Sequence, residues 1–447
     1  MKSIFKKELS TIMSTSEIKK ISNACSLKKL MFCIFGVLLL LVLRDIVGLD
    51  INKFFFIIPF AMAVYLLDFG EILYFFAFMI PVASGLPKNY IFLLLLFALI
   101  YKRHFAFNVF QISIPFLVFL AELLHLINFN DINVIDIGGY IAVITIISII
   151  VFEQKAKIEN DKILLFFALG SCSLILIILT STLEIMSLKD ALITGYRFGN
   201  VRNLMGDEVG LVLGNNANNI AYYAIIAISS ILVLMQNQKT SILTGLSMIF
   251  ILVFGGLLTL SRSFVITLIL LLFMYLMILA KPCGKNIITL ILGLLISLFL
   301  YNIIYWLFPD LIQNIMFRFQ ETSITGDRDI IFEQYTSFMM RNPIDFLLGV
   351  GLFPMLTITG MKFAPHNAIQ QVWVAYGFVG LSFFVYVICN MIIRAKDGKT
   401  IKLFFYLPLI VLIIFTQTIQ FLAPFELMLP LIIGISSIRM GTTDMEI

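Results

Sequence analysis

Charged residues are scarce in this chain of 447 residues. Lys, Arg, Asp and Glu together make up 13% of it, whereas hydrophobic residues make up 61%. A soluble domain usually has about 25% charged residues, so a surface this poor in charge would not keep a monomer dissolved. The scarcity excludes a secreted enzyme, a coiled coil and a disordered scaffold. The net charge of +5 is too small to indicate a nucleic acid as partner.

Metal-ligand clusters and the common catalytic motifs are missing as well. The sequence lacks the P-loop pattern, the HExxH zinc motif and the GxSxG nucleophile pattern. We therefore expect no cofactor and no metal, and a reaction driven by the substrate rather than by ATP. We expect the cysteines to fill space in the core without disulfides, because their spacing suits no metal site. They are Cys25, Cys33, Cys172, Cys283 and Cys389.

Long apolar runs dominate what is present. Because about 20 apolar residues cross a bilayer as a helix, the runs predict an all-α polytopic membrane protein with about 14 transmembrane helices. The number falls to 12 if the short runs do not all cross. The stretch 242–280 is too long for one helix, so we divide it at Ser261-Arg262-Ser263, its only charged point. The predicted spans are 30–47, 54–67, 72–84, 89–101, 109–128, 133–152, 163–183, 216–235, 242–260, 263–280, 287–308, 366–393, 403–420 and 424–438.

Lysines predict the orientation of these spans. The segment 1–29 is rich in lysine and has no small-residue cleavage site, so we interpret it as a retained cytoplasmic tail. With this tail inside, alternate loops are basic, as the positive-inside rule requires. An even number of spans places both termini in the cytoplasm. The whole chain, 1–447, is then one transmembrane domain with two long extracytoplasmic loops, 184–215 and 309–365.

Arginine, by contrast, predominates on the predicted outer side. Its planar guanidinium binds phosphate through two hydrogen bonds and stays charged, which topology alone does not require. The pattern therefore predicts an anionic ligand, such as a phosphate, on the outer side. The alternative is ion pairing with nearby acids such as Asp207, Glu208, Asp327, Asp329 and Glu333. The outer arginines are Arg44, Arg197, Arg202, Arg262, Arg318, Arg328 and Arg341.

Three features at the outer ends of spans indicate residues that could bind a substrate or take part in a reaction. Arg262 lies between apolar runs, where an arginine is costly and suggests a function, although it could serve only as a topology marker. His366, followed by Asn367, precedes a predicted span and could act as an acid or base near neutral pH. Clustered amides at the start of span 216–235 could cap a helix or bind sugar hydroxyls. These amides are Asn215, Asn216, Asn218 and Asn219.

The loop 309–365 also has a regular pattern. Residues 327–340 predict an amphipathic helix, and we expect its apolar side to lie on the bilayer surface. Asn342-Pro343 ends this helix, and the following Leu348-Gly349-Val350-Gly351 allows a sharp reversal of the chain. The apolar side consists of Ile331, Tyr335, Phe338 and Met339.

Taken together, these motifs resemble the O-antigen polymerase and O-antigen ligase superfamily. The resemblance is strongest to the Wzy-type polymerases of capsular or exopolysaccharide repeat units, and it extends over about residues 200–393. The motifs that carry it are short, and their order along the chain is part of the likeness. They are Ser261-Arg262-Ser263, Gly326-Asp327-Arg328, Asn342-Pro343 with Leu348-Gly349-Val350-Gly351, and His366-Asn367 with Gly377 and Gly380 downstream.

The resemblance implies a GT-C-type membrane fold and a metal-independent glycosyltransferase of the bacterial cytoplasmic membrane. The donor would be a growing glycan on undecaprenyl diphosphate, and the acceptor another lipid-linked repeat unit. The two would be joined on the outer face with loss of undecaprenyl diphosphate. Besides these glycans and the bilayer, a chain-length regulator and a flippase would be partners.

The resemblance also implies roles for single residues. Arg262 and Arg328 would hold the diphosphate, and His366 would activate or orient the acceptor hydroxyl. Further substrate contacts are expected from Arg202, Arg341, Arg197, Arg318, Asn367 and Asn218.

Two other functions stay open at this point. A ligase of the same superfamily would move the finished glycan to a different acceptor, and the sequence does not separate it from a polymerase. A flippase or transporter of the lipid-linked glycan would need cationic residues along a central cavity. The inner spans are nearly uncharged, and neither an internal repeat nor a midplane carboxylate relay is evident.

Overall fold

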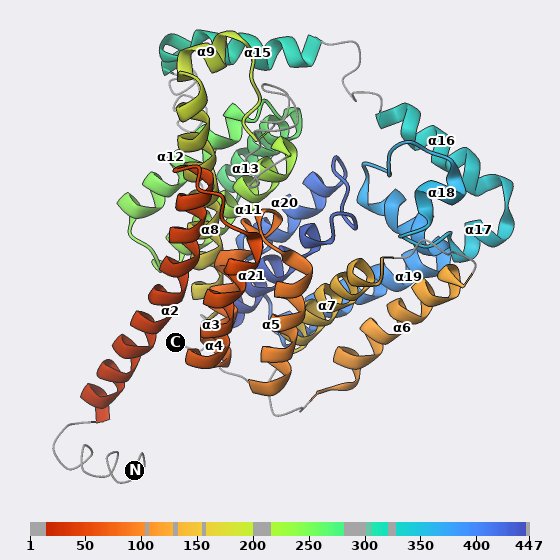
Figure 1. Cartoon of the computed structure of the whole chain (residues 1–447), viewed down its shortest axis with the longest axis horizontal. Coiled ribbons are helices and arrows are strands. Elements are labelled where there is room, and N and C mark those ends of the chain that lie inside the picture. The colour runs from red at the N-terminus through yellow and green to blue at the C-terminus, as the bar shows by residue number, and fades with distance from the viewer. Residues whose placement is uncertain are drawn as a thin grey trace.

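The computed structural model describes residues 15–102, 107–127, 133–153, 158–199, 216–280, 302–303, 305–320 and 328–443. Within these ranges the chain is helical and has no strand, which confirms the all-α prediction (Figure 1). The α-helices are α2 (Thr15–Asp45), α3 (Ile57–Leu66), α4 (Phe69–Met79), α5 (Lys88–Lys102), α6 (Val109–Leu126), α7 (Val134–Val151), α8 (Asn160–Ile185), α9 (Leu188–Ile193), α11 (Ala217–Gln236), α12 (Ile242–Leu258), α13 (Arg262–Ala280), α15 (Pro309–Gln320), α16 (Arg328–Arg341), α17 (Pro343–Leu348), α18 (Met355–Thr359), α19 (Ala368–Lys396), α20 (Leu407–Thr416) and α21 (Leu431–Thr443). Four 3-10 helices join them, η1 (Lys53–Phe56), η2 (Ala83–Gly85), η3 (Leu403–Tyr406) and η4 (Phe425–Met428).

Among the described residues, eight helices are long and apolar enough to cross a membrane. Four shorter apolar helices coincide with further predicted spans, at Lys53–Leu66, Phe69–Met79, Ile242–Leu258 and Leu403–Thr416. Most of the predicted span 287–308 lies outside the described residues. The eight long segments are Ser26–Asp45, Val109–Leu126, Val134–Val151, Asn160–Ile185, Ala217–Gln236, Arg262–Leu279, Ala368–Lys396 and Phe425–Thr442.

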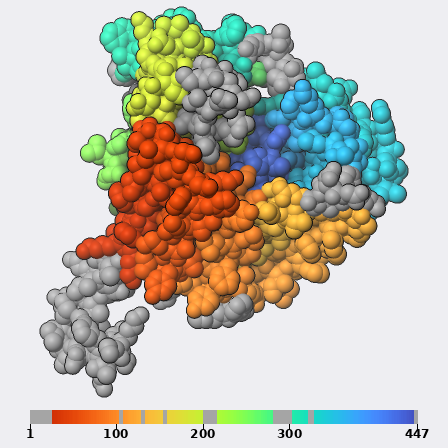
Figure 2. All heavy atoms as spheres, viewed as in Figure 1, coloured from red at the N-terminus to blue at the C-terminus, as the bar shows by residue number. Residues whose placement is uncertain are grey.

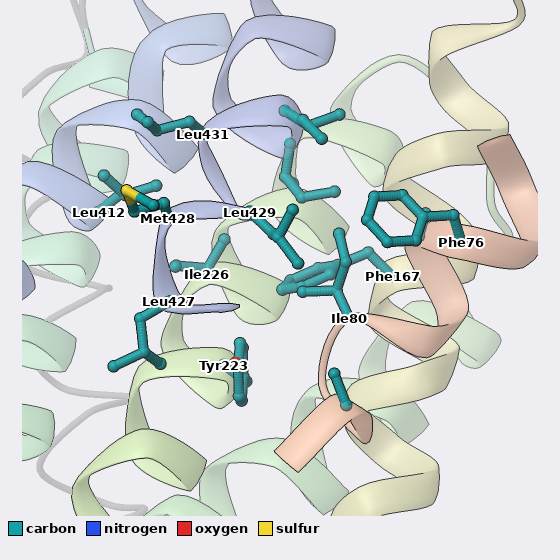
Figure 3. Packing of buried hydrophobic residues seen from close by; sticks show 14 of the residues in the cluster. Phe76, Ile80, Phe167, Tyr223, Ile226, Leu412, Leu427, Met428, Leu429 and Leu431 are labelled. Atoms are coloured by element: carbon teal, nitrogen blue, oxygen red, sulfur yellow. The ribbon is translucent and has the colours of Figure 1, made fainter. Parts of the chain in front are cut away.

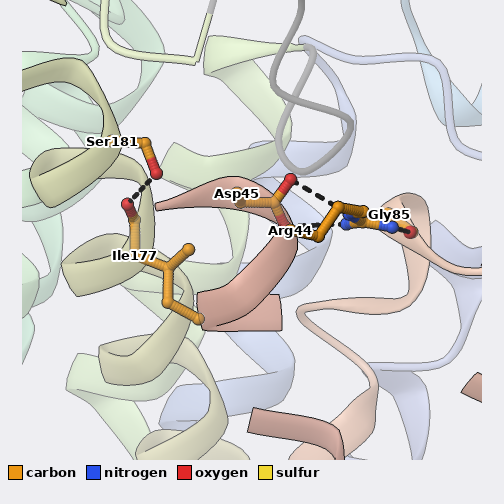
Figure 4. Close-up of polar contacts among 5 residues, drawn as sticks. All are labelled: Arg44, Asp45, Gly85, Ile177 and Ser181. Atoms are coloured by element: carbon orange, nitrogen blue, oxygen red, sulfur yellow. Dashed lines mark hydrogen bonds and ion pairs between the residues drawn. The ribbon is translucent and has the colours of Figure 1, made fainter. Parts of the chain in front are cut away.

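The helix α11 lies at the centre of the bundle and packs against α8, α12 and α20. Most of its residues are buried, including the large side chains of Tyr222 and Tyr223. Packing and hydrogen bonding, rather than a hydrophobic driving force, hold helices together in lipid. Figure 3 shows the resulting contacts, with side chains of α4, α8, α11, α20, η4 and α21 meeting in one cluster. Several serine and threonine hydroxyls inside this bundle bond to their own helix, as Ser181 does with the Ile177 carbonyl at 2.7 Å (Figure 4).

The apolar stretch 242–280 forms two helices, as predicted from its single charged point. The helix α12 ends at Leu258, and α13 begins at Arg262. Between them Leu260 has a φ of 49°, which an L-residue other than glycine rarely adopts. The Thr259 hydroxyl donates to the Gly256 carbonyl at 2.6 Å and accepts from the Ser261 amide at 3.3 Å. These bonds hold the turn that presents Arg262.

The helix α19 is broken at Gly377, where the backbone has a φ of 66°. The segment after α17 runs beside this break and repairs its hydrogen bonding. The Val350 amide donates to the Val374 carbonyl at 2.9 Å, and the Gly351 amide donates to the Ala375 carbonyl at 2.8 Å. The glycines predicted to reverse the chain thus return it to α19.

The apolar side of α16 was expected to contact the bilayer surface, and it packs against the protein instead. Tyr335 and Met339 are buried, and Ile331 and Phe338 pack against the core. The Tyr335 hydroxyl also donates to the Phe363 carbonyl at 2.9 Å. The apolar side of α16 therefore faces the protein, because a neighbouring segment that cannot be inferred from helix periodicity covers it. In Figures 1 and 2, α16, α17 and α18 lie on the right of the molecule, away from α2.

Candidate functional site

Arg262 and Arg318 meet although they belong to different helices. Arg262 is the first residue of α13, and Arg318 lies in the last turn of α15. The Arg262 Nη1 atom donates a hydrogen bond to the Arg318 backbone carbonyl at 3.2 Å. This contact fixes the guanidinium of Arg262 beside the end of α15. Two of the predicted ligand-binding arginines are therefore neighbours.

Arg328, at the start of α16, joins them electrostatically. Its pKa is lowered from the ordinary value, first by burial and then by the positive charges of Arg262 and Arg318. Three guanidinium groups from three helices thus act on one another. Guanidinium groups gathered in this way can bind an anion such as a phosphate.

His366 lies on the edge of this arginine cluster. Burial lowers its pKa from the ordinary value of 6.5, and the positive charge of Arg328 lowers it further. A hydrogen bond to the Ala364 backbone opposes both effects to a smaller extent. Its Nδ1 atom is buried and has no hydrogen-bond partner among the described residues. The imidazole is therefore neutral at pH 7 and presents a ring nitrogen that a ligand could use.

Arg197 and Asn218 support the turn before Arg262. The Arg197 Nε atom donates to the Thr259 carbonyl at 3.1 Å, and its Nη2 atom donates to the Asn218 Oδ1 atom at 3.1 Å. The next residue, Phe198, donates from its amide to the Leu258 carbonyl at 3.2 Å. The loop after α9, the start of α11 and the α12–α13 turn are thereby tied together.

The asparagines predicted at helix starts act as caps. Asn367 accepts a hydrogen bond from the Gln370 amide at 3.0 Å and caps α19. Asn216 accepts from the Asn218 amide at 2.9 Å and caps α11. The Asn218 side chain bonds to Arg197 instead, so the structure shows one amide of the cluster as a helix cap and another as a partner of an arginine. Asn215 lies outside the described residues.

One predicted substrate-binding arginine, Arg341, is not part of this cluster. Arg341 is exposed at the end of α16 opposite to Arg328, about 20 Å away at 1.5 Å per residue. Arg202 lies outside the described residues, as do Asp207, Glu208 and Asp327. The two other acids considered as ion-pair partners, Asp329 and Glu333, are exposed on α16.

Arg44 has a structural role. Its guanidinium pairs with Asp45 at 2.7 Å and donates to the Gly85 carbonyl at 2.7 Å (Figure 4). It also lies over the Phe56 ring, 4.9 Å from the centroid. Both side chains of the ion pair are almost fully buried. For this arginine the alternative of ion pairing was the correct one.

Sequence analysis assigned no role to Gln370, which joins α19 to α16. Its side-chain amide donates to the Phe332 carbonyl at 2.7 Å and to the Thr336 hydroxyl at 3.3 Å. Gln370 is buried one turn after His366, so it holds α16, and hence Arg328, beside the histidine. A polar residue four positions from His366 in an apolar span was the signal for it.

A second polar group that the sequence analysis did not identify lies on α6. Glu122 is fully buried and accepts a hydrogen bond from the Leu352 amide at 3.0 Å. His125, one turn later, contacts the Gly349 carbonyl at 3.1 Å. Together they attach the segment after α17 to α6. No group of three His, Cys, Asp or Glu side chains that could hold a metal ion occurs among the residues described.

The arrangement can bind an anion and accept a proton at one place. Guanidinium groups stabilise charge on phosphate oxygens, and a neutral imidazole can accept a hydrogen bond or a proton from a hydroxyl. Comparison of the chain with models of protein families, with curated proteins and with solved structures found no match.

Proposed function

We propose that this chain is a polysaccharide polymerase that joins lipid-linked oligosaccharide repeat units on the outer face of the bacterial cytoplasmic membrane. In this proposal the bundle has a GT-C-type fold with about 14 spans, and both termini are cytoplasmic. The observation that carries the proposal is the convergence of Arg262, Arg318, Arg328 and His366 from four separate segments. Such a group suits a substrate that has both a diphosphate and a reacting hydroxyl.

The arginines supply what the leaving group requires. When the bond between the anomeric carbon and the diphosphate breaks, negative charge develops on the departing oxygen. Fixed donors aimed at such a charge contribute roughly 10²–10³ in rate for each donor. Undecaprenyl diphosphate is already an activated leaving group, so the reaction needs no nucleotide. The guanidinium groups take the role that a metal ion has in other diphosphate enzymes.

His366 supplies what the acceptor requires. The acceptor hydroxyl attacks the anomeric carbon, a new carbon–oxygen bond forms, and the bond to undecaprenyl diphosphate breaks. The hydroxyl proton passes to the imidazole and then to the aqueous phase. Burial and the charge of Arg328 keep His366 neutral at pH 7, which is the form that can accept this proton.

Purified protein in liposomes tests the proposal. The liposomes contain lipid-linked repeat units, and the buffer contains a chelator and no nucleotide. A ladder of longer glycans on a gel supports the polymerase. A product on a different added acceptor, without a ladder, would identify a ligase. Substrate that crosses the bilayer unchanged would identify a transporter and refute the enzyme.

A further inference from the structure

A large apolar cavity lies away from the arginine cluster, between α6, α7, α17, α19 and α21. Its volume is about 740 Å³, and nearly all of its wall is aliphatic or aromatic. Four of the lining helices, α6, α7, α19 and α21, belong to candidate membrane spans. Ligand pockets generally have volumes of about 300–1,000 Å³, so the cavity is large enough for a ligand. Water would be a poor occupant, because the wall offers it few partners.

The cavity extends along most of α19. Its lining residues on this helix run from Val372 to Met391 at helical spacing. Counted along the two parts of α19 on either side of the break at Gly377, this stripe is roughly 28 Å long at 1.5 Å per residue, close to the ~30 Å thickness of a bilayer's hydrocarbon core. One acyl chain of a phospholipid reaches only through one leaflet, about half of that distance. A single chain that fills the cavity must therefore be longer than an ordinary acyl chain.

Several lining side chains are themselves exposed at the surface of the bundle. They include Leu117 and Leu124 on α6, Leu348 at the end of α17, and Val379 on α19. In a membrane-spanning bundle such exposed apolar side chains face the hydrocarbon. The cavity therefore opens sideways to lipid, and a hydrocarbon chain can enter it without crossing water.

Most of the few polar groups in the wall already bond to the protein, although the buried Ser148 hydroxyl has no partner among the described residues. The His125 ring contacts the Ala121 carbonyl at 2.7 Å and the Gly349 carbonyl at 3.1 Å. The hydroxyls of Tyr140 and Tyr376 bond to each other at 2.6 Å. Asp345 also lines the cavity and would repel an anionic headgroup. The wall is thus suited to a chain and offers little to a phosphate.

We propose that this cavity holds the polyisoprenoid chain of a lipid-linked substrate. The assignment rests on the proposed function, which supplies a lipid with such a chain. His366 precedes Val372 by six positions, two of them before α19 begins, so the two residues are no more than roughly 13 Å apart along the chain. A lipid whose chain lies against α19 therefore has its diphosphate within reach of His366 and Arg328. The cavity binds the chain, and the arginine cluster binds the head.

Two valines on α19 form a matched pair for the test. Val379 lines the cavity and Val385 does not, yet their exposed fractions are 56% and 53%. Val379→Trp should obstruct the cavity, whereas Val385→Trp adds the same side chain on another side of the helix. If the tryptophan at position 379 displaces about two methylene groups of the bound chain from the cavity, binding of the chain weakens by roughly tenfold. Both variants are first compared with the wild type by thermal unfolding.

The assay is photocrosslinking without turnover. Reconstituted protein is exposed to an undecaprenyl monophosphate probe with a diazirine in its chain, and in parallel to a phospholipid with a diazirine in a 16-carbon acyl chain. Labelled peptides are identified by mass spectrometry. We expect the polyprenyl probe to label α6 and α19, with roughly tenfold less labelling in Val379→Trp than in Val385→Trp. Unlabelled undecaprenyl phosphate should compete.

Equal labelling by the acyl probe would overturn the proposal, because an ordinary lipid tail would then be the occupant. Absence of label from both helices in the wild type would overturn it too, whatever the variants do. The liposome assay above tests the enzyme separately. A ladder without labelling refutes the cavity assignment alone. Labelling without a ladder keeps the chain site and refutes the polymerase.

Discussion

The Nη1 atom of Arg262 donates a hydrogen bond to the backbone carbonyl of Arg318 at 3.2 Å. The bond joins the start of α13 to the last turn of α15, two helices separated by a long stretch of chain. It directs the Arg262 guanidinium to the place where the charges of Arg318 and Arg328 also act. An arginine that looked isolated in an apolar run is therefore one member of a cluster.

Replacement of Arg262 should abolish polymer formation. We expect Arg262→Ala to lower the transfer rate by roughly 10²–10³, the usual effect of removing a donor from a developing charge. Arg262→Lys should recover little of it, because an ammonium cannot bind phosphate through a planar pair of donors. The measurement is the rate of ladder formation in liposomes.

Lys189→Ala is the control for this series, since Lys189 is an exposed cation on α9. It should show the wild-type rate. Full activity of Arg262→Ala at normal expression would refute the site. A similar loss in Lys189→Ala would show that the assay reports net charge rather than the cluster.

His366 should titrate below 6.5, because burial and the charge of Arg328 disfavour its protonated form. The transfer rate should fall as the pH drops through that lowered pKa, since an imidazolium cannot accept a proton. The chain has three histidines, so NMR of protein labelled at histidine can follow each ring, and His366→Asn identifies the signal. Arg328→Gln should raise the pKa of His366.

Arg341→Gln removes the same charge from the opposite end of α16. At about 20 Å from Arg328 it lies beyond the screening length of about 8 Å in physiological salt. The pKa of His366 should not change in this variant. An equal shift in Arg328→Gln and Arg341→Gln would contradict the placement of Arg328 beside the histidine.

Arg197 and Asn218 should behave as a coupled pair. Arg197→Ala and Asn218→Ala each remove the 3.1 Å bond between the two side chains, and a bond to a charged group contributes about 1.5–3 kcal/mol. We expect the double variant to lose less unfolding free energy than the two single variants lose together. The same should hold for the increase in the activation free energy of transfer. Additive losses would show that the bond does not support the Arg262 turn.

Gly377→Ala should destabilise the protein more than a positive φ alone explains. A Cβ at Gly377 would lie 2.2 Å from the Leu347 backbone, whereas at Gly398, with a φ of 72°, it would meet nothing within 4 Å. Gly398→Ala should therefore cost about 1–2 kcal/mol from its backbone conformation. Gly377→Ala should cost about 1–3 kcal/mol more because of the clash. If Gly377→Ala and Gly398→Ala had equal melting temperatures in detergent, the close approach of α17 and α19 would be refuted.

The membrane character and most helices were predictable because they depend on local sequence. Apolar runs of sufficient length form helices in lipid, where every backbone group must be hydrogen-bonded within its own segment. The split of 242–280 at Arg262 was predictable for the same reason. The count of 14 spans remains a prediction, since several runs are short and 287–308 lies mostly outside the described residues.

The candidate site was predictable in kind and only partly in membership. Residue type and position in the sequence pointed to Arg262, Arg328 and His366 individually, without showing which other residues lie beside each of them. Nothing in the sequence could show that Arg341 lies at the far end of α16 or that Arg44 is bound by Asp45 and Gly85. The same holds for the apolar side of α16, because periodicity shows that a side is apolar and does not show what covers it.

By itself, the sequence determined where the chain becomes helical and which residue types have chemical potential, because composition and spacing act over one or two turns. The tertiary structure alone decided which of those residues meet. Arg262, Arg318, Arg328 and His366 come from segments far apart in the chain, and packing brings them together through contacts such as Gln370 with Phe332 and Val350 with Val374. The cavity beside α19 has the same origin, since its wall is built from five helices and no single helix encloses it.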